Sequence, residues 1–262
     1  MNFRRIGAII LMHGEEFFDK AELLEILYWW VCDMVFLGFL GKSFSKLAEN
    51  NLFGTLIIIS FIAVRTTVAR NSIVMARLII YELSERTFVS TLATPLTQKE
   101  FIVARMIIGC LQALMRLCLG YILIFLFFGI NIFKLGSSLF ICLPFLIVSG
   151  WVLGLLTSSF VYVFGKQCQM LIQAFSFTFM ALCGVYAPVN TLPTFFQHVA
   201  HYLPTTYILT GLRENLTNGT PLWPFLLKNI VLNFAYTLVA LPLLYWSFRH
   251  VKEQGFASLE NR

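Results

Sequence analysis

Apolar runs long enough to cross a lipid bilayer make up most of this chain, and short polar segments separate them. A transmembrane helix needs roughly 17 to 25 predominantly apolar residues. Lipid leaves no water to satisfy a free backbone group, so a chain of apolar runs favours helices that satisfy their own. The pattern therefore predicts an all-α integral membrane protein, a single domain over residues 1–262, with six transmembrane helices at residues 23–44, 52–73, 101–129, 139–164, 170–186 and 222–248.

The first 22 residues have a different, amphipathic pattern. Arg4 and Arg5 precede the short apolar run Ile6–Met12, and acidic residues follow it. The run is too short for a signal peptide and no small-residue cleavage site follows. Apolar residues at Phe3, Ile6, Ile10, Phe17 and Phe18 can form one face of an interfacial helix. We expect an elbow helix that lies on the cytoplasmic leaflet.

Residues 79–100 form the longest charged interruption between the apolar runs. Glu82, Glu85 and Arg86 supply charge there, and Phe88 and Leu92 are too apolar for a free loop. Apolar anchors surrounded by charged contacts are typical of a protein-binding surface. We predict a cytoplasmic helix that docks a soluble partner, and the alternative is a solvated loop.

Residues 187–221 interrupt the pattern in another way. They hold Pro188, Pro193, Pro204 and Pro221, four of the eight prolines in the chain. Proline stops helices, so this stretch is too interrupted to span the membrane, yet it is too apolar for a free loop. His198 and His201 lie within it, but no third metal ligand is evident and metal binding is not expected.

Composition and charge agree with a membrane protein. The chain is 58% hydrophobic and 12% charged, whereas ordinary globular domains carry about 25% charged residues. The net charge of +6 does not indicate nucleic acid, because the basic residues lie at the ends of apolar runs. The six cysteines lie mostly inside those runs and form no CxxC pair, so we interpret them as packing residues.

The distribution of lysine and arginine predicts the topology. Eleven basic residues fall on the side of the N-terminus and five on the other: Arg4, Arg5, Lys20, Arg77, Arg86, Lys99, Arg105, Lys166, Arg249, Lys252 and Arg262, against Lys42, Lys46, Lys134, Arg213 and Lys228. Positive residues accumulate on the cytoplasmic side. Both termini are therefore expected in the cytoplasm.

These two interruptions, in this order, resemble segments of the permease subunit of type-2 ABC exporters. Glu82, Glu85 and Arg86 run into Thr94-Pro95-Leu96-Thr97 and then Glu100, which resembles the segment with the family's coupling helix. Ala187-Pro188, Leu192-Pro193, the run from His201 to Tyr207, and Leu212-Arg213 resemble the family's extracellular re-entrant helical hairpin. The resemblance covers nearly the whole chain.

The resemblance implies partners and a cofactor that this chain does not itself bind. It implies a homodimer or heterodimer of permeases and two separate ABC ATPase subunits, on which ATP and Mg²⁺ would bind. It implies a bacterial cytoplasmic (inner) membrane and export of a lipid, a glycolipid or polysaccharide, or a hydrophobic drug-like substrate. The hairpin would cap the exit with Pro188, Pro193, Tyr202, Pro204, Tyr207 and Arg213. An external loop without a gating role is the alternative.

Three ionisable residues lie deep inside predicted spans, away from the span ends: Asp33, Arg65 and Arg116. Charges there are costly and are usually paired or functional. One hypothesis is that one or more face the dimer cavity and meet a polar or anionic headgroup. The other is that Asp33 and Arg65 pair and tie the first two spans together.

Rival functions are a secondary transporter, a membrane anchor or scaffold, and an intramembrane enzyme. The two halves of the chain show no clear similarity, HExxH and GxSxG motifs are absent, and GFLGKS at residues 38–43 has Phe36 where a P-loop needs its first glycine. Gly150 and Gly154 form a GxxxG pair that permits close helix approach. No ATPase or other enzymatic site is expected in this chain.

Overall fold

The structure is a computed structural model that describes residues 51–84, 98–128 and 138–254, together with Gly7, Leu24, Tyr28, residues 31–33 and Phe36. This part is helical, with no β-strand among the described residues, so the all-α prediction is confirmed for it. The elements are α3 (Asn51–Val64), a π-helical turn (Arg65–Ala69), α4 (Arg70–Ser84), α6 (Gln98–Phe128), α7 (Ser138–Phe164), a 3-10 turn (Gly165–Cys168), α8 (Gln169–Leu182), a 3-10 turn (Val189–Thr191), α9 (Thr194–His201), α10 (Pro204–Asn218) and α11 (Trp223–Gln254).

Two sequence predictions fall largely outside the described residues. These are the elbow at residues 1–22 and the first span at residues 23–44, apart from the few positions named above. Most of the docking segment is also outside, including Glu85, Arg86, Phe88 and Leu92, whereas Glu82 belongs to the last turn of α4. For these segments the expectations remain predictions.

Four helices of the described part are long and apolar enough to cross a membrane, namely Ile58–Arg77, Ile102–Phe127, Ser138–Phe164 and Trp223–His250. They correspond to the second, third, fourth and sixth predicted spans. A chain with four such helices is an integral membrane protein.

The fifth predicted span is shorter than its apolar run suggested. Residues 170–186 were expected to cross, but α8 ends at Leu182 and has 14 residues. At 1.5 Å per residue that is about 21 Å, less than the bilayer core of about 30 Å. The chain leaves the helix at Gly184, whose φ of 78° is accessible to glycine at little cost. The apolar run continues past this break, so the helix end predicted from hydropathy, at residue 186, is wrong.

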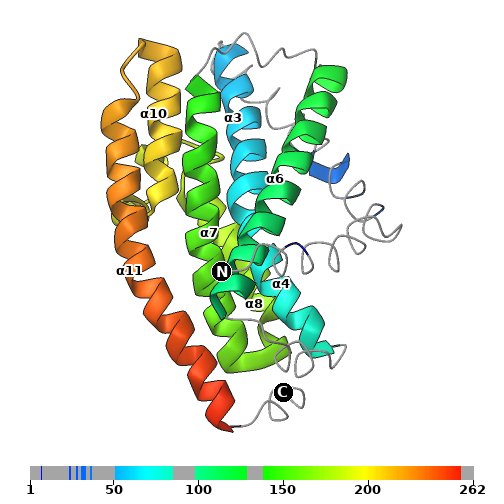
Figure 1. The fold of residues 1–262 in the computed structure, drawn as a ribbon. Helices are drawn as coiled ribbons and strands as arrows, with labels where there is room; N and C mark the ends of the chain where they lie inside the picture. Colours follow the sequence, from blue (N-terminus) through cyan, green and yellow to red (C-terminus); the bar gives the residue numbers. More distant parts are fainter. Residues whose placement is uncertain are drawn as a thin grey trace.

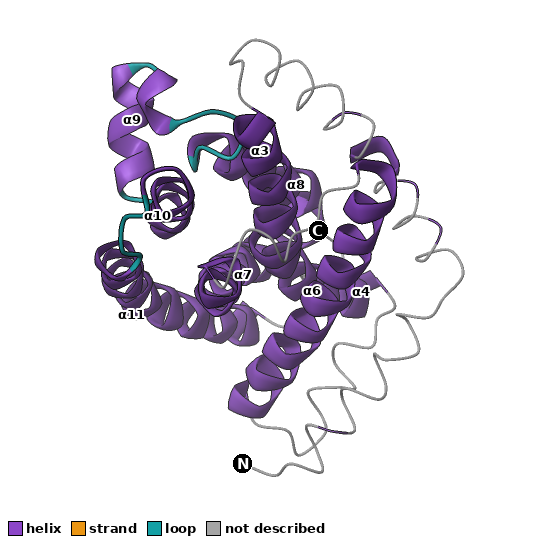
Figure 2. Cartoon of the chain, turned by 90° about the horizontal axis from the view of Figure 1, so that it is seen from above, coloured by secondary structure: helices purple, strands orange, loops and turns teal. Residues whose placement is uncertain are grey.

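The long helices lie side by side, and α7 is packed against most of the others (Figures 1 and 2). In Figure 1, α3 begins at the top of the bundle and continues through the π-helical turn into α4, which ends near the bottom. The C-terminal end of α11 also lies near the bottom. α10 lies beside the upper half of α11 rather than above the bundle. The predicted interruption at 187–221 is thus two short helices packed within the height of the bundle.

Small residues let α7 approach the second span closely. A Cβ atom added to Gly150 would lie 2.3 Å from the carbonyl oxygen of Thr67, and one added to Gly154 would lie 2.3 Å from Sδ of Met75. Neither position has room for a larger residue without a shift. The GxxxG pair therefore serves a helix contact inside this chain.

Candidate functional site

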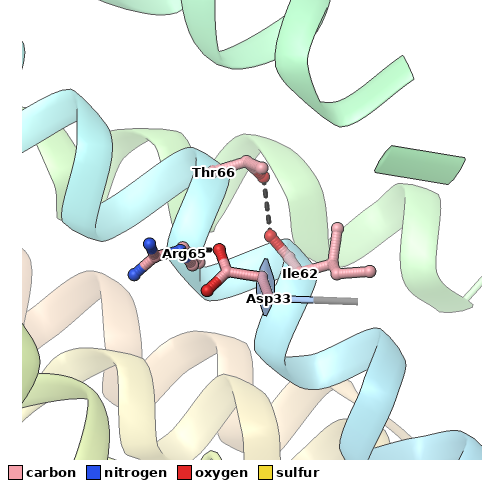
Figure 3. Close-up of polar contacts among 4 residues, drawn as sticks. All are labelled: Asp33, Ile62, Arg65 and Thr66. Atoms are coloured by element: carbon pink, nitrogen blue, oxygen red, sulfur yellow. Dashed lines mark hydrogen bonds and ion pairs between the residues drawn. The ribbon is translucent and has the colours of Figure 1, made fainter. Parts of the chain in front are cut away.

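An ion pair between Asp33 and Arg65 lies near the middle of the α3–α4 helix. Nε of Arg65 is 2.5 Å from Oδ2 of Asp33 (Figure 3). Relative side-chain exposure is 14% for Arg65 and 17% for Asp33, so both groups keep limited access to the surface. Of the two hypotheses for these residues, the pairing that ties Asp33 to the second span is present in the structure.

A π-helical turn carries Arg65. The backbone N–H of Arg70 donates to the carbonyl of Arg65, five residues earlier, which makes the turn wider than an α-helical one. The hydroxyls of Thr66 and Thr67 donate to the carbonyls of Ile62 and Ala63 at 2.7 and 2.5 Å. These bonds satisfy polar groups where the regular ladder changes. Turns of this kind are frequent at functional sites.

Two aromatic rings lie close to the Arg65 guanidinium. Its central carbon lies 5.7 Å from the ring centroid of Phe61 in α3 and 5.4 Å from that of Phe177 in α8. The ring of Tyr186 is 5.7 Å from that of Phe61. Such rings attract a cation through their faces, most strongly where water is scarce. The site therefore combines one carboxylate, one guanidinium and several aromatic rings from distant parts of the chain.

The predicted exit residues gather on α9, α10 and their connections. Pro188 precedes the 3-10 turn Val189–Thr191, and Pro193 precedes α9. Pro204 is the first residue of α10, where its missing N–H costs nothing. Proline thus starts each short helix of this region, which is why the chain folds into three short elements instead of one span.

Tyrosine and arginine side chains fix these short elements. The Tyr207 hydroxyl donates to the carbonyl of His201 at 3.0 Å, and the hydroxyl of Tyr236 in α11 donates to the carbonyl of Tyr202 at 3.1 Å. Arg213 donates to the carbonyl of Gly184 and, at 3.1 Å, to that of Val185. Burial lowers the pKa of the Arg213 guanidinium to about 10, so it is still charged at neutral pH.

A buried polar cluster that the sequence analysis did not single out joins three helices. Nδ2 of Asn229 donates to the Pro204 carbonyl at 2.9 Å and to Oγ of Ser149 at 3.2 Å. Nδ2 of Asn233 donates to Oγ of Ser149 and to Oδ1 of Asn229, both at 2.9 Å. The cluster links α7, α10 and α11. Two asparagines one helical turn apart in an apolar run were the signal in the sequence.

Arg116 and Glu82 lie elsewhere. Arg116 is buried in α6 at 3% exposure and is not a member of the Asp33–Arg65 pair. Glu82 is part of α4, toward the lower end of the bundle in Figure 1. The structure therefore brings together Asp33 and Arg65, gathers the exit residues separately, and leaves Arg116 outside both groups. In the described part of the chain no three His, Cys, Asp or Glu side chains gather as a metal site.

Membrane-length helices, a short broken segment between α8 and α11, and an ion pair within one of the long helices define a membrane-embedded helical protein. Residues 26–217 match the family model described as ABC-2 type transporter. The chain therefore belongs to the ABC-2 type transporter family, as the resemblance indicated. In this family it is a transmembrane permease component, not an ATPase, and membership implies an ABC ATPase partner. No curated protein matches the chain.

Proposed function

We propose that this chain is the membrane-spanning permease subunit of an ATP-driven exporter. It moves a lipid, a glycolipid or polysaccharide, or a hydrophobic drug-like substrate out of the cell. The observation that carries the proposal is the family match over residues 26–217, which includes the ion pair, the docking segment and nearly all of α10. The working assembly is a permease homodimer with two separate ATPase subunits that bind ATP and Mg²⁺, in the bacterial cytoplasmic membrane with both termini inside.

The second span is the element that transmits motion in this proposal. One helical rod runs from α3 through the π-helical turn to the end of α4 at Ser84, so a push at Glu82 reaches Arg65 through continuous backbone. Glu82, Glu85 and Arg86 provide charged contacts with the ATPase. Phe88 and Leu92 anchor the same segment by apolar contact.

The α9–α10 segment forms the exit in this proposal. Its support is that α10 is hydrogen-bonded to α11 through Asn229 and to the end of α8 through Arg213. α9 is less enclosed, because Phe195 within it and Tyr202 directly after it are 70% and 68% exposed. α10 is then the fixed side of the exit and α9 the side that moves.

Co-purification of an ATPase tests the proposal. The tagged full-length chain is extracted in a neutral detergent from its native membrane, with and without Glu82, Glu85 and Arg86 replaced by alanine. We expect a P-loop ATPase to accompany the unmodified protein and to be lost from the triple variant, because the charged docking contacts are gone. Mass spectrometry of the bound fraction gives the readout.

A control variant separates docking from general charge effects. Glu214→Ala with Lys228→Ala also removes charged side chains, but from α10 and α11, toward the opposite end of the bundle from α4's last turn. This variant should retain the ATPase. If the unmodified, well-folded protein brings no ATPase, the docking proposal is wrong, and a secondary transporter or a membrane anchor becomes the better interpretation.

A further inference from the structure

The Asp33–Arg65 ion pair is made through one edge of the guanidinium only. Nε of Arg65 contacts Oδ2 of Asp33, and the two terminal nitrogens of Arg65 point away from the carboxylate (Figure 3). Within the described part of the chain it is the one salt bridge of either group, and Arg70 acts on Asp33 only through a weaker electrostatic interaction. Among the described residues, none donates to Oδ1 of Asp33 or accepts from the terminal nitrogens of Arg65, so these are the atoms through which the pair can contact a ligand.

The open edge of Arg65 needs an acceptor at this depth. The terminal nitrogens carry four N–H bonds, and Arg65 lies within a membrane-length helix, where unpaired polar groups cost several kcal/mol. Two parallel N–H bonds of a guanidinium fit two oxygens of a phosphate or a carboxylate. The terminal nitrogens of Arg65 can therefore bind an oxyanion while Nε remains bound to Asp33.

Charge balance narrows the class of ligand. Asp33 already neutralises Arg65, so a ligand carrying a phosphate monoanion alone would leave the site with a net negative charge. Isolated charge is costly in the membrane. A ligand that also carries an ammonium restores neutrality, because Oδ1 of Asp33 can accept its N–H bonds. Each charged group of the ion pair then meets the opposite charge of the ligand.

Apolar surface lies next to the pair along the chain and in space. Val31 and Phe36, within three residues of Asp33, are 56% and 55% exposed. Phe177, whose ring lies over Arg65, is 47% exposed. Acyl chains of a bound amphiphile can cover these side chains while its headgroup meets the ion pair.

We infer that the Asp33–Arg65 ion pair binds the headgroup of an amphiphile that carries both a phosphate and an ammonium group. The phosphate lies on the outer edge of Arg65 and the ammonium on Oδ1 of Asp33. The binding site rests on this geometry alone. Its place in transport rests on the proposed function, for which it narrows the substrate class to zwitterionic phospholipid-like molecules.

Lipid binding by the purified full-length chain tests the inference. The chain is held in dodecyl maltoside, which has no charged headgroup, and native mass spectrometry follows the bound lipid. The probes are four lipids with identical acyl chains: a phosphatidylethanolamine, a phosphatidylglycerol, an uncharged diacylglycerol and a lipid with a quaternary ammonium. We expect the phosphatidylethanolamine to bind about tenfold more tightly than each of the others, since it alone makes both sets of charge-assisted bonds.

Neutralising each partner should reverse the preference in opposite directions. Asp33→Asn leaves Arg65 positive, so phosphatidylglycerol should become the preferred lipid. Arg65→Gln leaves Asp33 negative, so the quaternary ammonium lipid should become preferred. A purely structural ion pair would not produce this reciprocal change. Equal binding of phosphatidylethanolamine and phosphatidylglycerol by the unmodified chain, or an unchanged preference in both variants, would overturn the inference.

Matched controls remove the same charges elsewhere. Glu214→Gln in α10 and Lys228→Gln in α11 should keep the preference for phosphatidylethanolamine. Arg65→Lys keeps the charge but loses the paired N–H bonds, so affinity should fall several-fold without a switch to another lipid. If the neutralised variants fail to fold, Arg65→Lys and the four-lipid comparison on the unmodified chain still decide. Because no ATPase takes part, a failure here is distinct from a failure of the docking experiment.

Discussion

Arg65 and Arg213 are both arginines of the helical bundle, and their surroundings differ in a way that separates binding from support. Arg65 contacts the carboxylate of Asp33 through one nitrogen, and its other nitrogens point away from that partner. Arg213 donates to the backbone carbonyls of Gly184 and Val185, where the chain leaves α8. One arginine has an ionic partner and an open edge, whereas the other holds a backbone turn closed.

The partners of a buried arginine indicate its role. Backbone carbonyls are neutral, so these two contacts fix the turn without compensating the charge of Arg213, and burial lowers the pKa of its guanidinium. A carboxylate compensates the charge of Arg65 and leaves it able to exchange one partner for another. We therefore expect Arg213 to affect stability alone, and Arg65 to affect both stability and ligand preference.

The largest effect on stability is expected for Asp33→Leu. It leaves Arg65 without its counter-charge in the membrane, which should lower the free energy of unfolding by about 3 kcal/mol. Asp33→Leu combined with Arg65→Leu should recover most of this loss, because two apolar side chains suit the site better than one unpaired charge. Thermal unfolding of the purified chain in dodecyl maltoside measures both. A double variant as unstable as the single one would contradict this account of the pair.

A somewhat smaller effect is expected for Arg213→Met. The carbonyls of Gly184 and Val185 lose their charged donor, which should cost about 2 kcal/mol. The lipid preference proposed for Arg65 should not change. The thermal assay measures the loss of stability, and the four-lipid binding assay measures the lipid preference. A changed lipid preference in Arg213→Met would contradict the distinction between the two arginines.

Gly150→Ala tests whether the position of the Arg65 helix matters without touching any charge. The added methyl would overlap the carbonyl of Thr67, two residues beyond Arg65. We expect a loss of about 1.5 kcal/mol from overpacking and a weakened preference for phosphatidylethanolamine. Gly219→Ala is a useful comparison for a different kind of glycine: its Cβ would meet no atom within 4 Å, but its φ of 68° disfavours other residues. That variant should leave the lipid preference intact.

The smallest effect is expected for Asn233→Leu on the Arg213 side of the molecule. It removes two hydrogen bonds, to Ser149 and Asn229, at roughly 0.6 kcal/mol each in a membrane protein. The total loss should be about 1 kcal/mol. Val239→Leu, at an exposed apolar position of the same helix, should be neutral. A loss of several kcal/mol in Asn233→Leu would show that the cluster is more cooperative than its separate bonds.

Much of the fold could be predicted because lipid imposes simple rules on sequence. The second, third, fourth and sixth apolar runs each form a membrane-length helix. The prolines at 188, 193 and 204 start the short elements between α8 and α11, as their fixed φ and missing N–H require. Hydropathy failed at α8, where the break at Gly184 lies inside an apolar run and has no polar signal.

The site was predicted in part. Asp33 and Arg65 drew attention because charges are rare in spans, but spacing alone left pairing and cavity-facing roles open. The π-helical turn and the rings of Phe61 and Phe177 had no recognisable pattern, because they depend on contacts between helices. The cluster of Ser149, Asn229 and Asn233 was overlooked since neutral polar residues in an apolar run are common.

The sequence by itself determined the membrane class, the helical secondary structure, the order of the apolar runs and the two interrupted segments. Apolar length and proline position act locally along the chain, so they can be interpreted without a structure. Only the tertiary structure decided that Arg65 contacts Asp33 through one edge and that Arg213 donates hydrogen bonds to the turn after α8. It also decided that the second span packs closely against Gly150. Those outcomes depend on how separate helices pack, and packing is set by side chains that lie far apart in the sequence.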